Sequence, residues 1–244
     1  MGYKKSLLGA FTILAMLSAP AAAQELSLNL GEGDSLAGRS MLLIAGITLL
    51  SLAPGLAIMV TCFPFIVTVF SILRQAIGLQ QAPPNMLIIS LSLFLTWFIM
   101  EPVFTESWET ALQPLMNGAI DLPTAFREGV EPFRVFMAGR ADLDTYTAIA
   151  ELRPASEPLA SLTQAPLSTL IPSFMLSEIS RAFEIGFLVY LPFLIIDLVV
   201  SAVLMSMGMM MVPPAVVSMP FKLAFFVVAD GWTLLSSALV RSYF

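Results

Sequence analysis

The chain has 244 residues, of which 58% are hydrophobic and only 11% are charged, and its formal net charge is −6. Soluble domains carry roughly 25% charged residues, so this composition indicates a membrane protein of one or two domains. The absence of histidine and the single cysteine exclude a histidine general base, a zinc finger and an intrachain disulfide.

The first 23 residues have the pattern of a secretory signal peptide. Two lysines precede an apolar run, and small alanines follow it. This order predicts cleavage between Ala23 and Gln24, the alternative being an anchor that is not cleaved. Residues 24–40 are polar and contain three glycines, so we expect them to form a flexible lead outside the cytoplasm.

Two apolar blocks predict a first helical hairpin at residues 41–104. The first block, residues 41–73, carries no charge but would be roughly 50 Å long as a helix, well beyond a hydrocarbon core of about 30 Å. Because Pro54 and Pro64 interrupt it, we expect a helix broken near residue 54 and then a spanning or re-entrant segment. The second block, residues 86–100, ends before a Glu-Pro pair and is barely long enough to span.

The only substantial polar part is residues 105–184, called the middle section below. It has eleven acidic residues against five arginines, so it offers no basic surface for nucleic acid. Residues 153–172 contain four prolines and predict a loop. Four apolar residues at helical spacing predict an amphipathic helix, and they are Phe126, Val130, Phe133 and Met137.

Two further apolar blocks, residues 185–211 and 221–240, predict a second hairpin over residues 185–244. The expected fold class is therefore an all-α membrane protein, with four apolar helical blocks in two hairpins and a helical segment outside the cytoplasm. The signal peptide and the acidic middle section predict that this section and both termini lie on the extracytoplasmic side.

Three charged residues lie inside the apolar blocks, namely Asp197, Lys222 and Asp230. Charges in lipid cost several kcal/mol, so such residues are functional candidates by default. Asp197 and Asp230 lie at similar distances from the hairpin turn, and paired carboxylates would suit a proton-coupled transporter or an intramembrane aspartyl protease. The protease is disfavoured because valines precede Asp230 where Gly-x-Gly would be required.

A simpler alternative is that one aspartate caps a helix end or pairs with Lys222 of a neighbouring chain. The sequence contains no Ser/Lys or Cys/His pair pattern and no phosphate-binding loop. We therefore expect no enzyme activity, no cofactor and no metal.

Methionines crowd the end of the third apolar block. Five of the seven residues at 205–211 are methionine, and Pro213 and Pro214 follow, where we expect the helix to break. Methionine is flexible and specifies packing weakly, so it is a poor choice as core filler. If several copies surrounded an axis, these side chains would form a deformable apolar collar, although simple helix packing is the alternative. The methionines are Met205, Met207, Met209, Met210 and Met211.

Two blocks, residues 72–103 and 170–232, closely resemble the FliP family. This family is the export-gate subunit of the flagellar type III secretion system, and SctR is its injectisome relative. The shared motifs in chain order are Ser177-Glu178, Ala182-Phe183, Ile185-Gly186-Phe187, Pro192-Phe193, Ile196-Asp197, the methionine run, Pro220-Phe221-Lys222 and Asp230-Gly231-Trp232.

The resemblance implies a core channel subunit of the flagellar basal body in the bacterial inner membrane, which passes unfolded export substrates outward. It implies a ring of several copies joined by FliQ and FliR, with FlhA and FlhB beneath. It also implies a tapered helical channel, much of it raised above the membrane plane. In that channel the methionine-rich loop lines the closed pore, with residues 209–211 at the constriction.

The resemblance further implies salt bridges between subunits, formed by Glu178, Arg181, Asp197, Lys222 and Asp230. Family members usually carry a hydroxyl and an arginine where this chain has Pro64-Phe65. They also place a basic residue directly after Ser-Glu-x, whereas here Ser180 stands there and Arg181 follows, which turns the basic group by about 100° around a helix. An injectisome homologue and a small proton-coupled transporter are the alternatives to the flagellar channel subunit.

Overall fold

The computed structural model describes residues 41, 43–48, 51, 55, 58–78, 83–152, 161–209 and 211–244. It divides the chain into two compact units, Met1–Leu50 and Ser51–Phe244. The expected signal cleavage site, the lead, the helix break near residue 54 and Met210 lie outside the described residues. Every regular element among the described residues is a helix, which confirms the all-α class.

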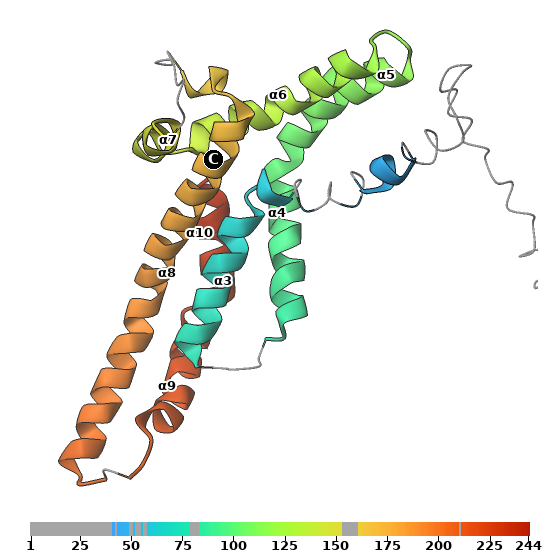
Figure 1. Cartoon of the computed structure of the whole chain (residues 1–244). Coiled ribbons are helices and arrows are strands. Elements are labelled where there is room, and N and C mark those ends of the chain that lie inside the picture. The colour runs from blue at the N-terminus through green and yellow to red at the C-terminus, as the bar shows by residue number, and fades with distance from the viewer. Residues whose placement is uncertain are drawn as a thin grey trace, which may run out of the picture. The chain divides into compact units, whose positions relative to one another are not determined.

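The helices α3 (Phe63–Ile77) and α4 (Asn85–Ser107) run antiparallel in the second unit (Figure 1). Pro64 lies in the first turn of α3, where a missing N–H costs nothing, and Gly78 ends the helix with φ +87. The helix extends beyond the apolar block, because α4 continues through Glu101 and Pro102 to Ser107. A proline removes one helical hydrogen bond, but the surrounding packing can retain the helix.

After α4 the chain passes through a π-helical turn, η1 (Trp108–Leu112), and α5 (Gln113–Met116), and then returns as α6 (Leu122–Arg140). The amphipathic helix predicted for the middle section is α6. Ser107 donates a hydrogen bond to the carbonyl oxygen of Gly129 at 2.8 Å, which fixes the crossing of α4 and α6.

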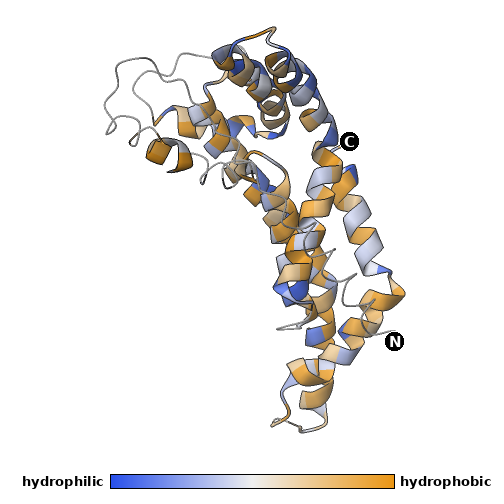
Figure 2. Ribbon diagram, turned by 90° about the vertical axis from the view of Figure 1, so that its right-hand side faces the viewer, coloured by the Kyte–Doolittle hydropathy of each residue, from blue (hydrophilic) through white to orange (hydrophobic). Residues whose placement is uncertain are grey.

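Two short elements follow, α7 (Leu143–Ala150) and the 3-10 turn η2 (Leu162–Gln164). The side chain of Asp142 caps α7 by accepting a hydrogen bond from the backbone N–H of Thr145 at 2.9 Å. Figure 2 shows that hydrophilic residues are concentrated in this part of the molecule, around α6 and α7, whereas hydrophobic residues dominate the long helices.

The longest helix is α8 (Leu167–Ser206), whose 40 residues extend for about 60 Å, twice a bilayer core of about 30 Å. It passes through Pro172 and Pro192 without ending. The loop expected at residues 153–172 is therefore wrong from Leu167 onward. The expected boundary between the middle section and the second hairpin, at residues 184–185, lies inside this continuous helix.

The chain returns along α8 as α9 (Pro214–Val228) and α10 (Gly231–Arg241), which are bent by 60° relative to each other. Asp230 at the bend adopts φ +47, which is uncommon for a residue with a side chain. A Cβ atom at Gly231 would lie 2.1 Å from the ring of Phe226, so only glycine fits there.

By length and apolar composition, the described residues contain two helices that could cross a membrane, or three if the bent pair α9–α10 is counted as one span. The two are Asn85–Met116, which includes α4, and α8. The 15 residues of α3 extend for only about 22 Å. The four expected blocks therefore do not correspond to four spanning helices among the described residues.

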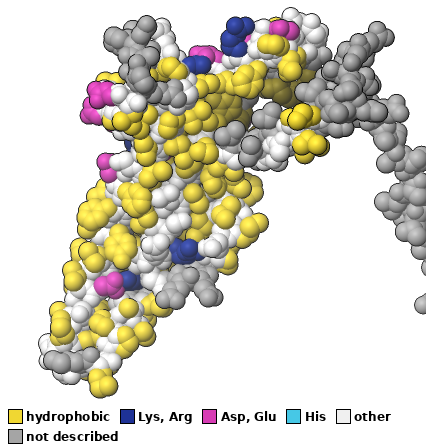
Figure 3. All heavy atoms as spheres, viewed as in Figure 1, with side chains coloured by type: hydrophobic (Ala, Val, Ile, Leu, Met, Phe, Trp, Pro, Cys, Tyr) yellow, Lys and Arg dark blue, Asp and Glu magenta, His cyan; other side chains and the backbone are white. Residues whose placement is uncertain are grey.

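The core of the second unit is built around α3, which packs against α8, α4 and α9. One face of α3 is almost completely buried, through Phe65, Ile66, Val69, Phe70, Leu73, Ala76 and Ile77. Hydrophobic side chains are not confined to this core, because they also cover much of the outer face seen in Figure 3. A surface of this kind requires lipid or protein neighbours.

Gly186 allows α8 to approach α3, because a Cβ atom there would lie 2.4 Å from Cδ1 of Ile72. We predict that Gly186→Val lowers the free energy of unfolding by about 1–3 kcal/mol through overpacking. Gly139→Ala in α6 is the matched control, since no atom lies within 4 Å of the added Cβ. Thermal unfolding in detergent, followed by tryptophan fluorescence, measures both, and equal midpoints for the two variants would contradict this packing.

Candidate functional site

The methionine-rich turn joins α8 to α9 and begins with a Schellman motif. The backbone N–H of Gly208 donates to the carbonyl of Met205 at 3.0 Å, and that of Met209 donates to Leu204 at 2.9 Å. Gly208 has φ +74, the left-handed conformation that this motif requires. The helix therefore ends just before Gly208 rather than at the prolines.

The two prolines begin the next helix. Pro213 precedes α9 as its N-cap residue, and Pro214 is the first residue of α9. Proline suits this position because its fixed φ is helical and its missing N–H has no partner in the first turn. We expected Pro213 and Pro214 to break the helix at the turn. They instead fix the start of the return helix α9, after α8 has already ended.

The four described methionine side chains of the turn are exposed within the single chain. Met209 is 43% exposed and Met211 is 98% exposed, and Met205 and Met207 lie between these values. A groove of about 560 Å³ runs beside the turn between α8 and α9, and Met207 and Met209 form part of its wall. The soft side chains are therefore available to a neighbouring molecule.

An ion pair holds the stem of this turn. The Nζ atom of Lys222 in α9 lies 2.6 Å from Oδ2 of Asp197 in α8 and donates to the carbonyl of Ala76 in α3 at 3.0 Å. The hydroxyl of Ser218 donates to the other oxygen of Asp197 at 2.5 Å. Three helices thus meet at one buried ammonium group. Lys222 and Asp197 thus pair within one chain, and a pairing of Lys222 with a neighbouring chain stays a prediction.

Asp230 does not join this group. It is exposed at the bend between α9 and α10, and its side chain makes no capping hydrogen bond. Among the described contacts, none links Asp230 to Asp197, whose two oxygens bind Ser218 and Lys222. The carboxylate pair that a proton-coupled transporter would require is therefore not formed within the chain.

A second charged cluster surrounds Glu178, which is completely buried in α8. Its Oε1 atom accepts a hydrogen bond from Nε of Arg140 at 3.0 Å, and Nη1 of Arg181 lies 3.6 Å away. The hydroxyl of Tyr243 donates to Oε2. Glu178 is thus paired within its own chain, and Arg181 stays near it despite its shifted position. The expected bridge between subunits stays a prediction.

The sequence did not predict the contacts that Ser242 and Tyr243 make with Arg140 and Glu178. Arg140 donates from Nη1 to the carbonyl of Ser242 at 3.0 Å, and its guanidinium lies 4.0 Å from the ring centre of Tyr243. Burial raises the pKa of Tyr243 well above its ordinary value, and the negative charge of Glu178 adds to this, so the hydroxyl remains a proton donor. No local pattern identifies this role, because the partners lie far apart in the sequence.

Phe65 also has a role that its sequence position did not reveal. It stands where the resemblance stated above implies an arginine, yet it is fully buried and meets the ring of Tyr243 edge to face, with 5.6 Å between ring centres. Pro64 before it lies in the first turn of α3. Packing therefore occupies this position in place of a charge.

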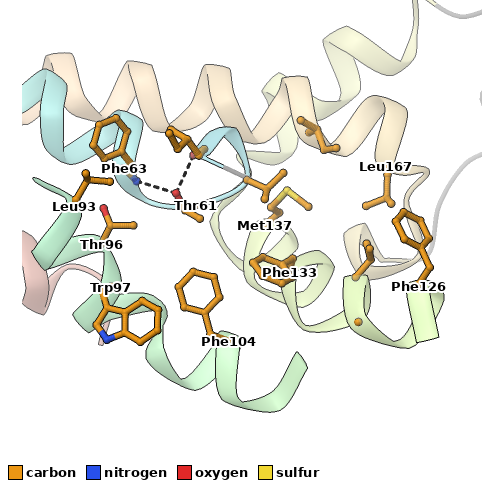
Figure 4. A pocket seen from close by; sticks show the side chains of 15 residues that line it. Thr61, Phe63, Leu93, Thr96, Trp97, Phe104, Phe126, Phe133, Met137 and Leu167 are labelled. Atoms are coloured by element: carbon orange, nitrogen blue, oxygen red, sulfur yellow. Dashed lines mark hydrogen bonds between the residues drawn. The ribbon is translucent and has the colours of Figure 1, made fainter. Parts of the chain in front are cut away.

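An apolar groove of about 580 Å³ lies between α4, α6 and the start of α8 (Figure 4). The apolar face of α6 forms one wall through Phe133 and Met137, and Trp97 and Phe104 of α4 form the other. Its polar side chains are threonines, which offer no acid, base or activated nucleophile. Within the described residues, no three potential metal ligands cluster. This groove is suited to packing rather than to chemistry.

An all-helical chain with two or three candidate spans and a large exposed apolar surface is a membrane protein built to pack against neighbours. Residues 46–239 match the model of the FliP family, and the chain belongs to that family.

Three relatives illustrate the similarity, and each is named flagellar biosynthetic protein FliP. The protein of Caulobacter vibrioides is 46% identical over 98% of this chain and 89% of its own length. The protein of Bacillus subtilis is 45% identical over 81% of this chain and 89% of its own length. The protein of Aquifex aeolicus is 44% identical over 89% of this chain and 91% of its own length.

The ion pair predicts an asymmetric response to substitution. Lys222 is more deeply buried than Asp197, whose side chain is 31% exposed. Removing Asp197 therefore destabilises the fold more than removing Lys222, because it leaves the more deeply buried charge without a partner. We predict that Asp197→Asn lowers the free energy of unfolding by about 2–3 kcal/mol and that Lys222→Met lowers it less. The double variant should be close to Lys222→Met alone.

Thermal unfolding of the two single variants and the double variant in detergent completes this cycle. Arg241→Met is the control, because Arg241 is an exposed cation at the end of α10 and should leave the midpoint unchanged. Equal and additive losses for the two single variants would contradict the arrangement described here.

Proposed function

We propose that the chain is a core channel subunit of the flagellar type III export apparatus, which passes unfolded export substrates across the bacterial inner membrane without enzymatic activity. The observation that carries this proposal is the exposed methionine-rich turn, held in place by Gly208 and by the ion pair of Lys222 with Asp197. Membership of the FliP family and the names of the relatives support the flagellar apparatus.

The length of α8 supports a ring of several copies. Its exposed apolar side chains run from Leu176 to Val203, which is roughly 40 Å along the helix and exceeds a hydrocarbon core of about 30 Å. Lipid alone therefore does not cover this surface, and protein neighbours must complete the cover. We assign that role to further copies of the chain and to FliQ and FliR, with FlhA and FlhB beneath the assembly.

The collar follows from symmetry and side-chain chemistry. When several copies surround an axis, their turns bring Met205, Met207, Met209, Met210 and Met211 together into one apolar ring. Such a ring dewets when it is empty and so excludes ions. Methionine has three rotatable bonds, so the same ring conforms to an extended polypeptide of any sequence.

The contacts of Ser242 and Tyr243 support the proposed topology. Arg140 in the middle section binds Ser242 and contacts Tyr243, which supports a location of the middle section and the C-terminus on the same side of the membrane. With the proposed signal peptide, that side is the extracytoplasmic one. The methionine-rich turn, at the far end of α8, then faces the cytoplasmic side.

Two alternatives are less well supported. An injectisome subunit would share the mechanism, but the relatives described above are flagellar proteins. A proton-coupled transporter would use Asp197 and Asp230, but the carboxylate of Asp197 is bound by Ser218 and Lys222.

Replacing Met209, Met210 and Met211 together with alanine tests the collar. We expect the assembly to form and the membrane to leak small ions, because three methyl side chains per copy no longer fill the axis. Ion flux into vesicles or cells that carry the variant measures the leak. Met86→Ala with Met116→Ala is the matched control, since these exposed methionines lie on α4 and α5 away from the turn. Unchanged membrane tightness in the triple variant would count against the collar.

A further inference from the structure

The last residues of the chain occupy the junction of three other helices. The ring of Tyr243 meets Phe65 of α3 edge to face and stacks on Phe136 of α6, with 6.1 Å between the latter ring centres. Its hydroxyl donates to the buried Glu178 of α8. One side chain at the C-terminus therefore contacts three helices that are distant from it in sequence.

The backbone before this side chain is also bound. Arg140 donates to the carbonyl of Ser242 at 3.0 Å while its guanidinium covers the ring of Tyr243. The next residue behaves differently, because Phe244 is 78% exposed. The binding is therefore specific to residues 242 and 243 and does not include the final side chain.

Loss of the Tyr243 side chain would destabilise the residues that it contacts. Glu178 has no exposed surface, and one of its two oxygens has the Tyr243 hydroxyl as its hydrogen-bond donor. A buried carboxylate that loses a donor is strongly destabilised. Phe65 and Phe136 would also lose the ring that lies against both of them.

We propose that Ser242 and Tyr243 form a closing element, which locks α3, α6 and α8 together only when these two residues reach their junction. Because Phe65, Arg140 and Glu178 precede them in the chain, this part of the fold stays open until residues 242 and 243 have been synthesised. The presence of residues 242 and 243 at this junction is thus a condition for closing it. This proposal does not depend on the proposed channel function.

The chain carries its own reporter of this closure. Cys62 is the single cysteine, it has no exposed surface, and it lies three residues before Phe65 at the same end of α3. A thiol that is buried in the closed state reacts with a maleimide only when the surrounding structure opens. The labelling rate of Cys62 therefore measures how often the junction opens.

The experiment uses the full chain in detergent and a small maleimide, with labelling followed by mass spectrometry. We expect Tyr243→Ala to label at least about tenfold faster than the wild type, because the junction loses both its wedge and its donor. Tyr243→Phe keeps the ring but not the hydroxyl, so it should label faster than the wild type and slower than Tyr243→Ala. A chain that stops after Arg241 should behave like Tyr243→Ala.

Phe244→Ala is the matched control and should label at the wild-type rate, since this side chain is exposed. Wild-type labelling of Cys62 in Tyr243→Ala would overturn the proposal. If Tyr243→Ala does not accumulate, Tyr243→Phe decides: faster labelling than the wild type supports the closing element, and an unchanged rate overturns it.

Discussion

The ion pair between Lys222 and Asp197 determines where the methionine-rich turn can lie. The ammonium group binds Asp197 on α8 and the carbonyl of Ala76 at the end of α3, so the return helix α9 has one register against both neighbours. A buried charge tolerates little displacement from its partners. The turn lies beyond this point on both helices, so its position relative to α3 is fixed. Its methionine side chains remain flexible.

The two charged clusters link the helices at different positions along α8. The pair at Lys222 lies near the turn, and the cluster around Glu178 lies on the same helix α8, closer to its start. Both form their ion pairs within one chain, and the outer surface is largely apolar. Neighbouring subunits can therefore pack against this surface without first breaking an ion pair. Asp230 is the exception, since its carboxylate is exposed at the bend of α9 and α10.

Much of the fold could be predicted from local patterns. The spacing of Phe126, Val130, Phe133 and Met137 gave α6, and the crowding of methionines before two prolines gave the turn. Prolines were the main source of error, because Pro172 lies inside the continuous helix α8. A proline weakens a helix locally, but packing along its length decides whether it ends.

The candidate site was predicted only in part, because local patterns do not show how distant helices pack. Lys222 and Asp197 were singled out because charges in apolar blocks are rare, but their pairing within one chain depends on how α8 and α9 pack. Gly208 could have been identified as the helix end, since glycine commonly follows a helix C-terminus. Tyr243 could not, because nothing in the sequence near it indicates Phe65, Arg140 or Glu178 as partners.

The central claim is that the methionine-rich turns of several copies surround one axis. Native mass spectrometry tests it most directly, on the protein released in mild detergent from membranes that also contain the proposed partners FliQ and FliR. The account predicts one complex with several copies of this chain and two other small membrane proteins. A monomer or a simple dimer, repeated across detergents, would contradict it, because the methionines would then have no ring to close.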